Sequence, residues 1–287
     1  MSMSSIQNSI LDRIHIGTAN FNSHYGLTKN QDNVENLLGN IWALGITKLD
    51  LSNKYIFGLK DLKNDKQNWQ IQLKIHIDVR QPEESYRREL NYALLNMNTN
   101  NIDRILIHNG DEFLYENDIS DLHKLFKMTP VKVKFGVSLY DLPNLLKVIE
   151  SDFVKIIQFP ANIFDRRLAG IKDNSQHLLN INHKILQARS IFLQGLILNN
   201  YSTFPQNLIS HKNILENWYH WNNRNNIDLL ESSLGEVLNH QKIEEITIGI
   251  DSSEHLKQLV NVNLNQLRYT TPDSIPDLLI DPRKWKK

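Results

Sequence analysis

Residues 103–138 read DRILIHNGDEFLYENDISDLHKLFKMTPVKVKFGVS, and this stretch decides the fold. The runs at 103–108 and 131–138 are short, apolar and rich in residues that favour strands. Residues 116–127 between them have the apolar spacing of a helix. A strand, a helix and a second strand in this order predict a right-handed parallel βαβ unit.

The same alternation continues in both directions along the chain. We expect further strands at 14–18, 47–51, 69–75, 153–159, 185–192 and 243–250. We expect further helices at 32–44, 83–97, 141–149, 173–184 and 253–262, and more than one within 206–240. Eight such units predict a closed (β/α)8 TIM barrel, with residues 1–287 forming a single domain.

An open doubly wound sheet is the alternative fold. It usually has a glycine-rich G-x-G-x-x-G turn after its first strand. This chain has GTANFNSHYG at 17–26 instead, which favours the barrel.

The composition excludes several classes of function. The 32 Lys and Arg residues equal the 32 Asp and Glu residues, so we expect neither a nucleic-acid nor a membrane partner. The chain has no cysteine, and His211 and His220 lack metal-ligand spacing, so we expect no metal site. Residues 1–17 do not resemble a signal peptide, and no apolar run approaches the roughly 20 residues of a membrane span. We therefore expect a cytoplasmic protein.

Polar side chains stand where several of these strands are expected to end. Asp50 ends the second strand, Lys74 lies near the end of the third, and His108 ends the fourth. The carboxyl ends of the strands in such a barrel meet at one face, which carries the active site. Taken singly, Lys74 is also consistent with a solvent-facing strand residue, and His108 with a histidine of the core.

Together these side chains suit the reduction of a carbonyl group. That reaction needs a hydride from a cofactor, a proton donor and stabilisation of the negative charge on the carbonyl oxygen. Tyrosine is a weak acid with a pKa of about 10, but a neighbouring ammonium favours its phenolate. A neutral histidine donates a second hydrogen bond to the carbonyl. Tyr55, five residues after Asp50, completes this set.

The chain resembles the aldo-keto reductase superfamily over most of its length. The blocks that carry the resemblance are IGTANF (16–21), GITKLDLSNKY (45–55), LKI (73–75), IDRILIH (102–108), FGVSLYD (135–141), QFPANIFDRR (158–167), ARSIFLQGLIL (188–198) and TIGIDSSEHLKQL (247–259). The last three most resemble a bacterial branch often found among surface-polysaccharide genes. No single block is specific, but eight in the correct order are.

The resemblance implies a role for each candidate residue. The catalytic group would be Asp50, Tyr55, Lys74 and His108, with Tyr55 as the general acid. The cofactor would be NADPH, with NADH as the alternative, and the substrate an aldehyde or ketone, a sugar-derived carbonyl among them. The residues implied in cofactor binding are Gly17, Thr18 and Ala19 at the first strand end, Ser138 and Gln158 at the nicotinamide carboxamide, and Ser252 and Ser253 at a phosphate.

Some departures from the family pattern keep other functions open. Ile56 stands where a glycine usually follows the tyrosine, and the stretch from Tyr55 to Lys74 is shorter than usual. These departures leave a nicotinamide-nucleotide-binding sensor or scaffold with weak or lost catalysis as the alternative function. A barrel lyase or hydrolase is a weaker third. The C-terminal tail DLLIDPRKWKK (277–287) either covers the barrel or caps a pocket, or else frays, and the oligomeric state is not indicated.

Overall fold

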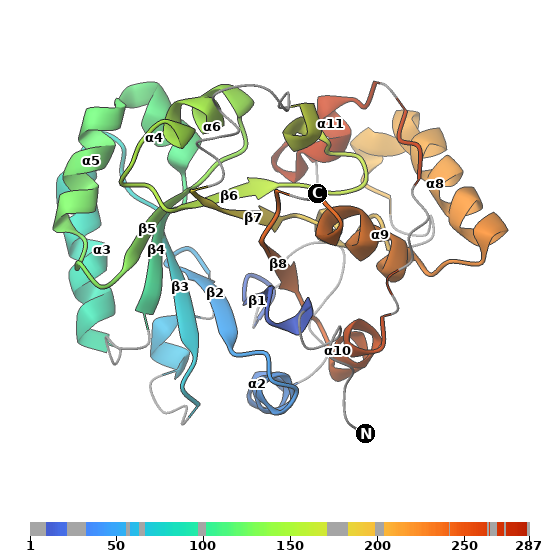
Figure 1. Ribbon diagram of the computed structural model, residues 1–287, viewed down its shortest axis with the longest axis horizontal. Coiled ribbons are helices and arrows are strands. Elements are labelled where there is room, and N and C mark those ends of the chain that lie inside the picture. Colours follow the sequence, from blue (N-terminus) through green and yellow to red (C-terminus); the bar gives the residue numbers. More distant parts are fainter. Residues whose placement is uncertain are drawn as a thin grey trace.

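Eight parallel strands follow one another in chain order around a closed barrel, and β8 pairs with β1 to close it (Figure 1). The expected (β/α)8 barrel is therefore confirmed, and the open doubly wound sheet is excluded. The strands are β1 (Ile14–Gly17), β2 (Lys48–Ser52), β3 (Gln70–Ile75), β4 (Ile102–Ile107), β5 (Lys134–Ser138), β6 (Ile156–Pro160), β7 (Ile185–Arg189) and β8 (Glu245–Gly249). The computed structural model describes residues 10–21, 33–55, 58–62, 67–96, 102–170, 183–198, 204–240, 242–262, 264, 269–272 and 274–285.

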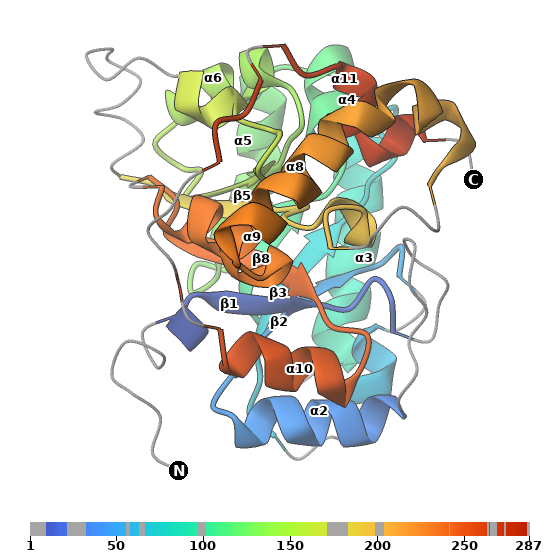
Figure 2. The same ribbon diagram turned by 90° about the vertical axis from the view of Figure 1, so that its right-hand side faces the viewer.

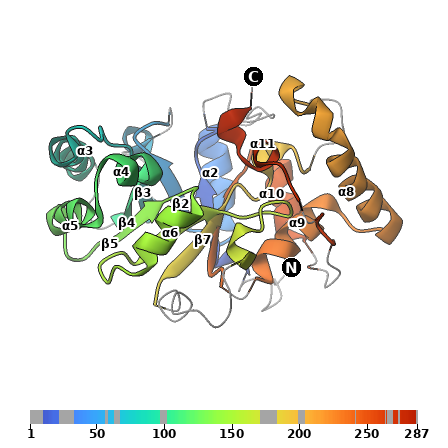
Figure 3. The same cartoon turned by 90° about the horizontal axis from the view of Figure 1, so that it is seen from above.

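Helices cover the outside of the barrel. α3 and α5 lie together on one side and α8 lies on the opposite side (Figures 1 and 3). α2 and α10 lie side by side next to β1 and β2, where Asn40 donates a hydrogen bond to Ser253 (Figure 2). The described helices are α2 (Val34–Ala43), α3 (Pro82–Asn96), α4 (Gly110–Glu116), α5 (Ile119–Met128), α6 (Leu142–Ile149), α8 (Lys212–Asn225), α9 (Leu229–Leu238), α10 (Ser253–Val260) and α11 (Asp277–Ile280).

The helix α2 shows how the sequence determines an element. Asn33 caps its first turn by accepting hydrogen bonds from two backbone N–H groups, and the apolar spacing buries Val34, Leu37, Leu38 and Ile41 against the barrel. Gly45 follows with a φ of +84°, a conformation that glycine adopts without strain. The expected end of this helix is therefore confirmed.

Several expected bounds of elements need correction. β6 begins at Ile156 rather than 153, and β7 ends at Arg189 rather than 192. The helix expected at 116–127 is α5, which begins at Ile119 because Asp118 is extended and caps it with its own side chain. The helix α4 precedes it and was not expected. β5 begins at Lys134 rather than 131 because residues 131–133 form a turn after Pro130. The helix expected at 173–184 falls outside the described residues except for its last two, which lie in a turn before β7.

The connection from β2 to β3 is short, as its sequence predicts. In its described part, its one helical element is the 3-10 turn Leu59–Leu62. Among the residues that the structure describes, no helix has both the length and the apolar character to cross a membrane.

A second hydrophobic core lies beside the barrel, and we call it the α8 core. It includes Leu215 and Trp218 of α8, Tyr269, and Leu279 and Ile280 of α11. The C-terminal segment is therefore packed up to Trp285, whose indole N–H donates to the carbonyl of Leu278 at 2.9 Å. Of the alternatives for the tail, the structure favours the covering one for residues 274–285.

Candidate active site

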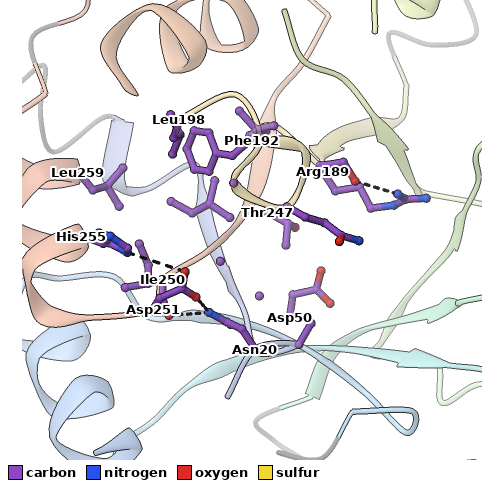
Figure 4. A pocket seen from close by; sticks show the side chains of 18 of the residues that line it. Asn20, Asp50, Arg189, Phe192, Leu198, Thr247, Ile250, Asp251, His255 and Leu259 are labelled. Carbon is purple, nitrogen blue, oxygen red and sulfur yellow. Dashed lines mark hydrogen bonds and ion pairs between the residues drawn. The ribbon is translucent and has the colours of Figure 1, made fainter. Parts of the chain in front are cut away.

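A cavity of about 960 Å³ opens at the carboxyl ends of the strands. Its lining includes Gly17 of β1, Asp50 of β2, Lys74 of β3, Arg189 of β7 and Gly249 of β8. Figure 4 shows Asp50 and Arg189 toward one end of the cavity and His255 and Leu259 of α10 at the other. The cavity thus lies at the face where barrels of this kind carry their chemistry.

Asp50 and Lys74 form an ion pair in the floor of this cavity. The Lys74 Nζ lies 3.2 Å from the Asp50 Oδ1, and the side chains are 4% and 0% exposed. Burial alone would lower the pKa of Lys74, but the Asp50 carboxylate and the nearby Tyr55 phenol outweigh it and raise the pKa above its ordinary value. Lys74 is therefore a buried ammonium at neutral pH.

His108 follows β4 and lines the cavity as a neutral imidazole. Burial, reinforced by the positive charges of Lys74 and Arg189, holds the pKa of His108 well below its ordinary value. The His108 Nδ1 lies 2.8 Å from the Ser52 hydroxyl, which already accepts the Lys54 N–H. When the hydroxyl donates its hydrogen to Nδ1, the imidazole hydrogen lies on Nε2.

Tyr55 lies in the turn that follows β2, with its N–H bonded to the carbonyl of Ser52 at 3.1 Å. Its ring centroid is 5.8 Å from that of His108 and 5.3 Å from the Lys74 Nζ. The structure thus brings together the four residues expected to be catalytic. Their roles in catalysis remain predictions.

Ser138 and Gln158 lie next to this group but are not among the residues that line the described cavity. The Gln158 Nε2 donates to the Asp50 Oδ2 at 2.7 Å, and the Gln158 Oε1 accepts from the Ser138 hydroxyl at 3.0 Å and from Lys74 at 3.4 Å. In this arrangement both residues hold the ion pair in place. Their expected contact with a carboxamide stays a prediction.

The remaining candidate residues lie at the carboxyl end of β1 and at the amino end of α10. Gly17 and Ala19 line the cavity, whereas Thr18 is buried and donates to the carbonyl of Asp50 at 3.1 Å from its N–H and 3.2 Å from its hydroxyl. Ser252 caps α10 by accepting the N–H of His255, and the Ser253 hydroxyl is a partner of Asn40. Both serines therefore have structural roles, which do not conflict with the expected phosphate contact.

The sequence patterns did not single out four further groups of the site. Ser52 is one of them, and it shares a strand face with Asp50. His76, Tyr140 and Arg283 line the cavity as well. Arg283 comes from the C-terminal segment, and no local pattern predicts that this segment reaches the barrel.

The comparisons with known proteins agree with this geometry. The family model described as "Aldo/keto reductase family" matches residues 13–275. No curated protein sequence matches the chain.

Three solved structures resemble the fold at low sequence identity, and the likeness extends to the fold alone. The apo form of the aldo-keto reductase AKR11C1 from Bacillus halodurans superposes with a TM-score of 0.63 at 17% identity, over 90% of this chain and 94% of that chain. Its holo form gives 0.62 at 16% identity, over 94% and 95%. The glycerol dehydrogenase AKR11B4 from Gluconobacter oxydans gives 0.63 at 17% identity, over 90% and 88%.

Proposed function

We propose that this chain, which belongs to the aldo/keto reductase family, reduces an aldehyde or ketone to an alcohol with Tyr55 as the general acid. Membership of this family implies an NAD(P)H-dependent oxidoreductase that acts on small carbonyl compounds. The observation that carries the proposal is the buried ion pair of Asp50 and Lys74 beside Tyr55 and a neutral His108.

The residues of the cavity fit a nicotinamide dinucleotide. The volume of about 960 Å³ lies at the upper end of small-molecule pockets, as an extended dinucleotide requires. Gly17 and Gly249 are neighbours in the β1–β8 register, and a Cβ added to Gly249 would meet no atom closer than 3.8 Å. An extended ligand therefore has room to lie against the backbone between Ala19 and the start of α10. This cofactor would supply the hydride.

The protein side of the reaction follows from the four side chains. A carbonyl oxygen held between the Tyr55 hydroxyl and the His108 Nε2–H accepts two hydrogen bonds. The Lys74 ammonium stabilises the negative charge that develops on this oxygen and then on the phenolate, after Tyr55 has given up its proton. Asp50 and Gln158 keep the ammonium in place.

Several finer points belong to the same proposal. NADPH is the cofactor that the family resemblance implies, with NADH as the alternative, and Ser138, Gln158, Ser252 and Ser253 would assist its binding. A sugar-derived substrate, the relation to surface-polysaccharide genes and a cytoplasmic location rest on the sequence alone.

Replacing Tyr55 by Phe tests the proposal directly. The variant should bind NADPH or NADH as the wild type does, in a fluorescence titration of both nucleotides, because the ring remains. Its turnover of a panel of aldehydes should fall by at least about 100-fold, since the general acid is lost. Near-normal turnover in this variant would remove Tyr55 from the mechanism.

The short β2–β3 connection favours one second candidate, a nucleotide-binding sensor. In this protein a single 3-10 turn is the described helical element of that connection, and it directly follows the Tyr55 segment. Tight binding of a reduced nucleotide, without hydride transfer in a single-turnover experiment on the aldehyde panel, would favour the sensor over the reductase.

A further inference from the structure

Arg189 is a cation in the cavity wall whose charge no carboxylate neutralises among the residues that the structure describes. It ends β7, and its guanidinium donates to the Ser138 hydroxyl and the Ser190 hydroxyl, both at 3.3 Å, and to the carbonyl of Leu139 at 3.0 Å. It also stacks on the ring of Tyr140, 3.8 Å from the centroid. These contacts are with neutral groups and use three of its five N–H donors. A half-buried guanidinium thus keeps a full positive charge and two donors for a ligand.

The other two cations near this wall, Lys74 and Arg283, already have carboxylate partners. Lys74 is paired with Asp50. Arg283, which stacks on the same Tyr140 ring at 3.5 Å, forms two hydrogen bonds of 2.8 Å with Asp281. The Asp111 carboxylate accepts the N–H groups of Tyr140 and Asp141 and an amide N–H of Asn144. Of these three cations, Arg189 is therefore the one without a carboxylate partner among the described residues, while Asp111, whose hydrogen-bond partners are neutral N–H groups, keeps a negative charge in the same wall.

Arg189 lies close enough to Lys74 that one small ligand can contact both residues. Three successive hydrogen bonds of 3.3, 3.0 and 3.4 Å link its Nε through Ser138 and Gln158 to the Lys74 Nζ. The guanidinium nitrogen and the ammonium are separated by no more than the sum of these distances. Its charge also acts on His108, whose pKa it helps to lower.

We propose that Arg189 binds a carboxylate of the substrate, so that the carbonyl compound reduced by this protein carries an acidic group a few carbons from its carbonyl. This inference rests on the proposed reductase function and names its substrate class. A guanidinium offers the paired donors that a carboxylate accepts. A phosphate, which carries about −1.5 to −2 at neutral pH, would bring more negative charge than a carboxylate into a wall that also holds the Asp111 carboxylate.

Steady-state reduction of matched substrates tests the proposal. Succinic semialdehyde and its methyl ester have the same carbon chain and differ in charge, and glyceraldehyde 3-phosphate with glyceraldehyde forms a phosphate pair. The wild type should favour the acid over the ester by about 10-fold to 100-fold in kcat/KM, mostly through KM, as expected for a hydrogen-bonded charge. Its preference for glyceraldehyde 3-phosphate over glyceraldehyde should be smaller.

Three variants separate a specific contact from a general effect of charge. Arg189→Gln should reduce the acid-to-ester ratio to about one, and Arg189→Lys should retain part of it. Arg283→Gln removes a positive charge from the same Tyr140 stack, and it should keep the ratio because that charge is already paired with Asp281. A wild type without preference, or a ratio that falls as much in Arg283→Gln, would overturn the proposal.

A binding measurement keeps this inference separate from the proposed function. Succinate, titrated calorimetrically into the protein with NADPH or NADH present, should bind the wild type and not Arg189→Gln. If no aldehyde is reduced, the reductase function fails, and this titration still decides whether Arg189 binds a carboxylate. If Arg189→Gln instead loses affinity for the nucleotide and keeps that for succinate, Arg189 serves the cofactor and the proposal is wrong.

Discussion

At the scale of single residues, position along a strand explains most of the candidate site. Asp50, Lys74 and His108 could be predicted from strand ends alone, because parallel strands bring those ends to one face of a barrel. Tyr55 depended on its spacing from Asp50 and on the family resemblance, since a turn residue has no periodicity to place it. The role of Ser52 could not be predicted because its partner His108 lies 56 positions away. Arg189 also stands at a strand end, but its contact with Tyr140, 49 positions away, could not be predicted.

The hydrogen bond from Ser52 to His108 carries a testable consequence. Ser52→Ala removes the partner of Nδ1, so the imidazole is no longer held as the Nε2–H tautomer in one orientation. We expect kcat to fall about 10-fold, the magnitude of one lost hydrogen bond in an active site, with nucleotide affinity unchanged. The tautomer itself is measurable by ¹⁵N NMR of the His108 ring.

A conservative variant shows whether the hydroxyl acts through His108. Ser52→Thr keeps the hydroxyl and should restore both the tautomer signal and most of kcat. An NMR signal that stays purely Nε2–H in Ser52→Ala would show that Ser52 does not set the tautomer.

At the scale of elements, local pattern predicted strands and helices well and predicted their long-range packing poorly. A helix such as α2 can be predicted from its capping residue, Asn33, and from its regular apolar spacing. The helix expected at 116–127 is present as α5, and it begins at Ile119 because Asp118 caps it, whereas the preceding helix α4 was not predicted. The tail from Asp277 onward has too few residues for a periodic signal, so only the fold shows that it joins the α8 core.

The packed tail predicts a measurable contribution to stability. Leu279 of α11 is fully buried in the α8 core. Leu279→Ala should lower the free energy of unfolding by about 2–4 kcal/mol, which is the range for removing a buried leucine side chain. Urea unfolding followed by tryptophan fluorescence measures this change.

The matched control lies in a nearby surface element. Ile209 belongs to the 3-10 helix Gln206–His211, which is in the same region, but its side chain is 51% exposed. Ile209→Ala should change stability by no more than about 0.5 kcal/mol. Equal effects of the two variants would mean that the tail is not packed.

At the scale of the whole molecule, the barrel encloses a charged cluster that no local pattern predicts. His15 of β1, Arg104 of β4 and Glu245 of β8 come from strands far apart in the sequence and meet inside the barrel, at the end away from the cavity. The Arg104 Nη2 donates to the Glu245 Oε1 at 2.8 Å, and the His15 Nε2 lies 3.1 Å from the Glu245 Oε2. Closure of the barrel is what brings these side chains together, so strand-by-strand analysis could not find the cluster.

This cluster makes stability depend on pH in a direction that can be derived. Burial lowers the pKa of His15 in the folded protein, so the unfolded chain, with a histidine pKa of about 6.5, binds more protons at mildly acidic pH. The free energy of unfolding therefore falls as pH drops below about 6.5. His76 and His108, whose pKa values are also lowered, act in the same direction.

Glu245 adds a second fall at lower pH. Burial alone would raise its pKa, but His15 and Arg104 outweigh it and lower the pKa below its ordinary value. Its contribution is present above the pKa of an unfolded glutamate, about 4.3, and is lost as pH falls further.

His15→Gln isolates the histidine because its amide still donates to Glu245 but does not titrate. Urea unfolding of both proteins from pH 8 to 5 should give a shallower pH dependence in the variant, by up to about 1.4 kcal/mol per pH unit below pH 6.5, the effect of one proton. Because His76 and His108 remain, part of the slope should persist in the variant. If the two slopes coincide, His15 is not the buried neutral group that the geometry implies, and the acid sensitivity of the fold arises elsewhere.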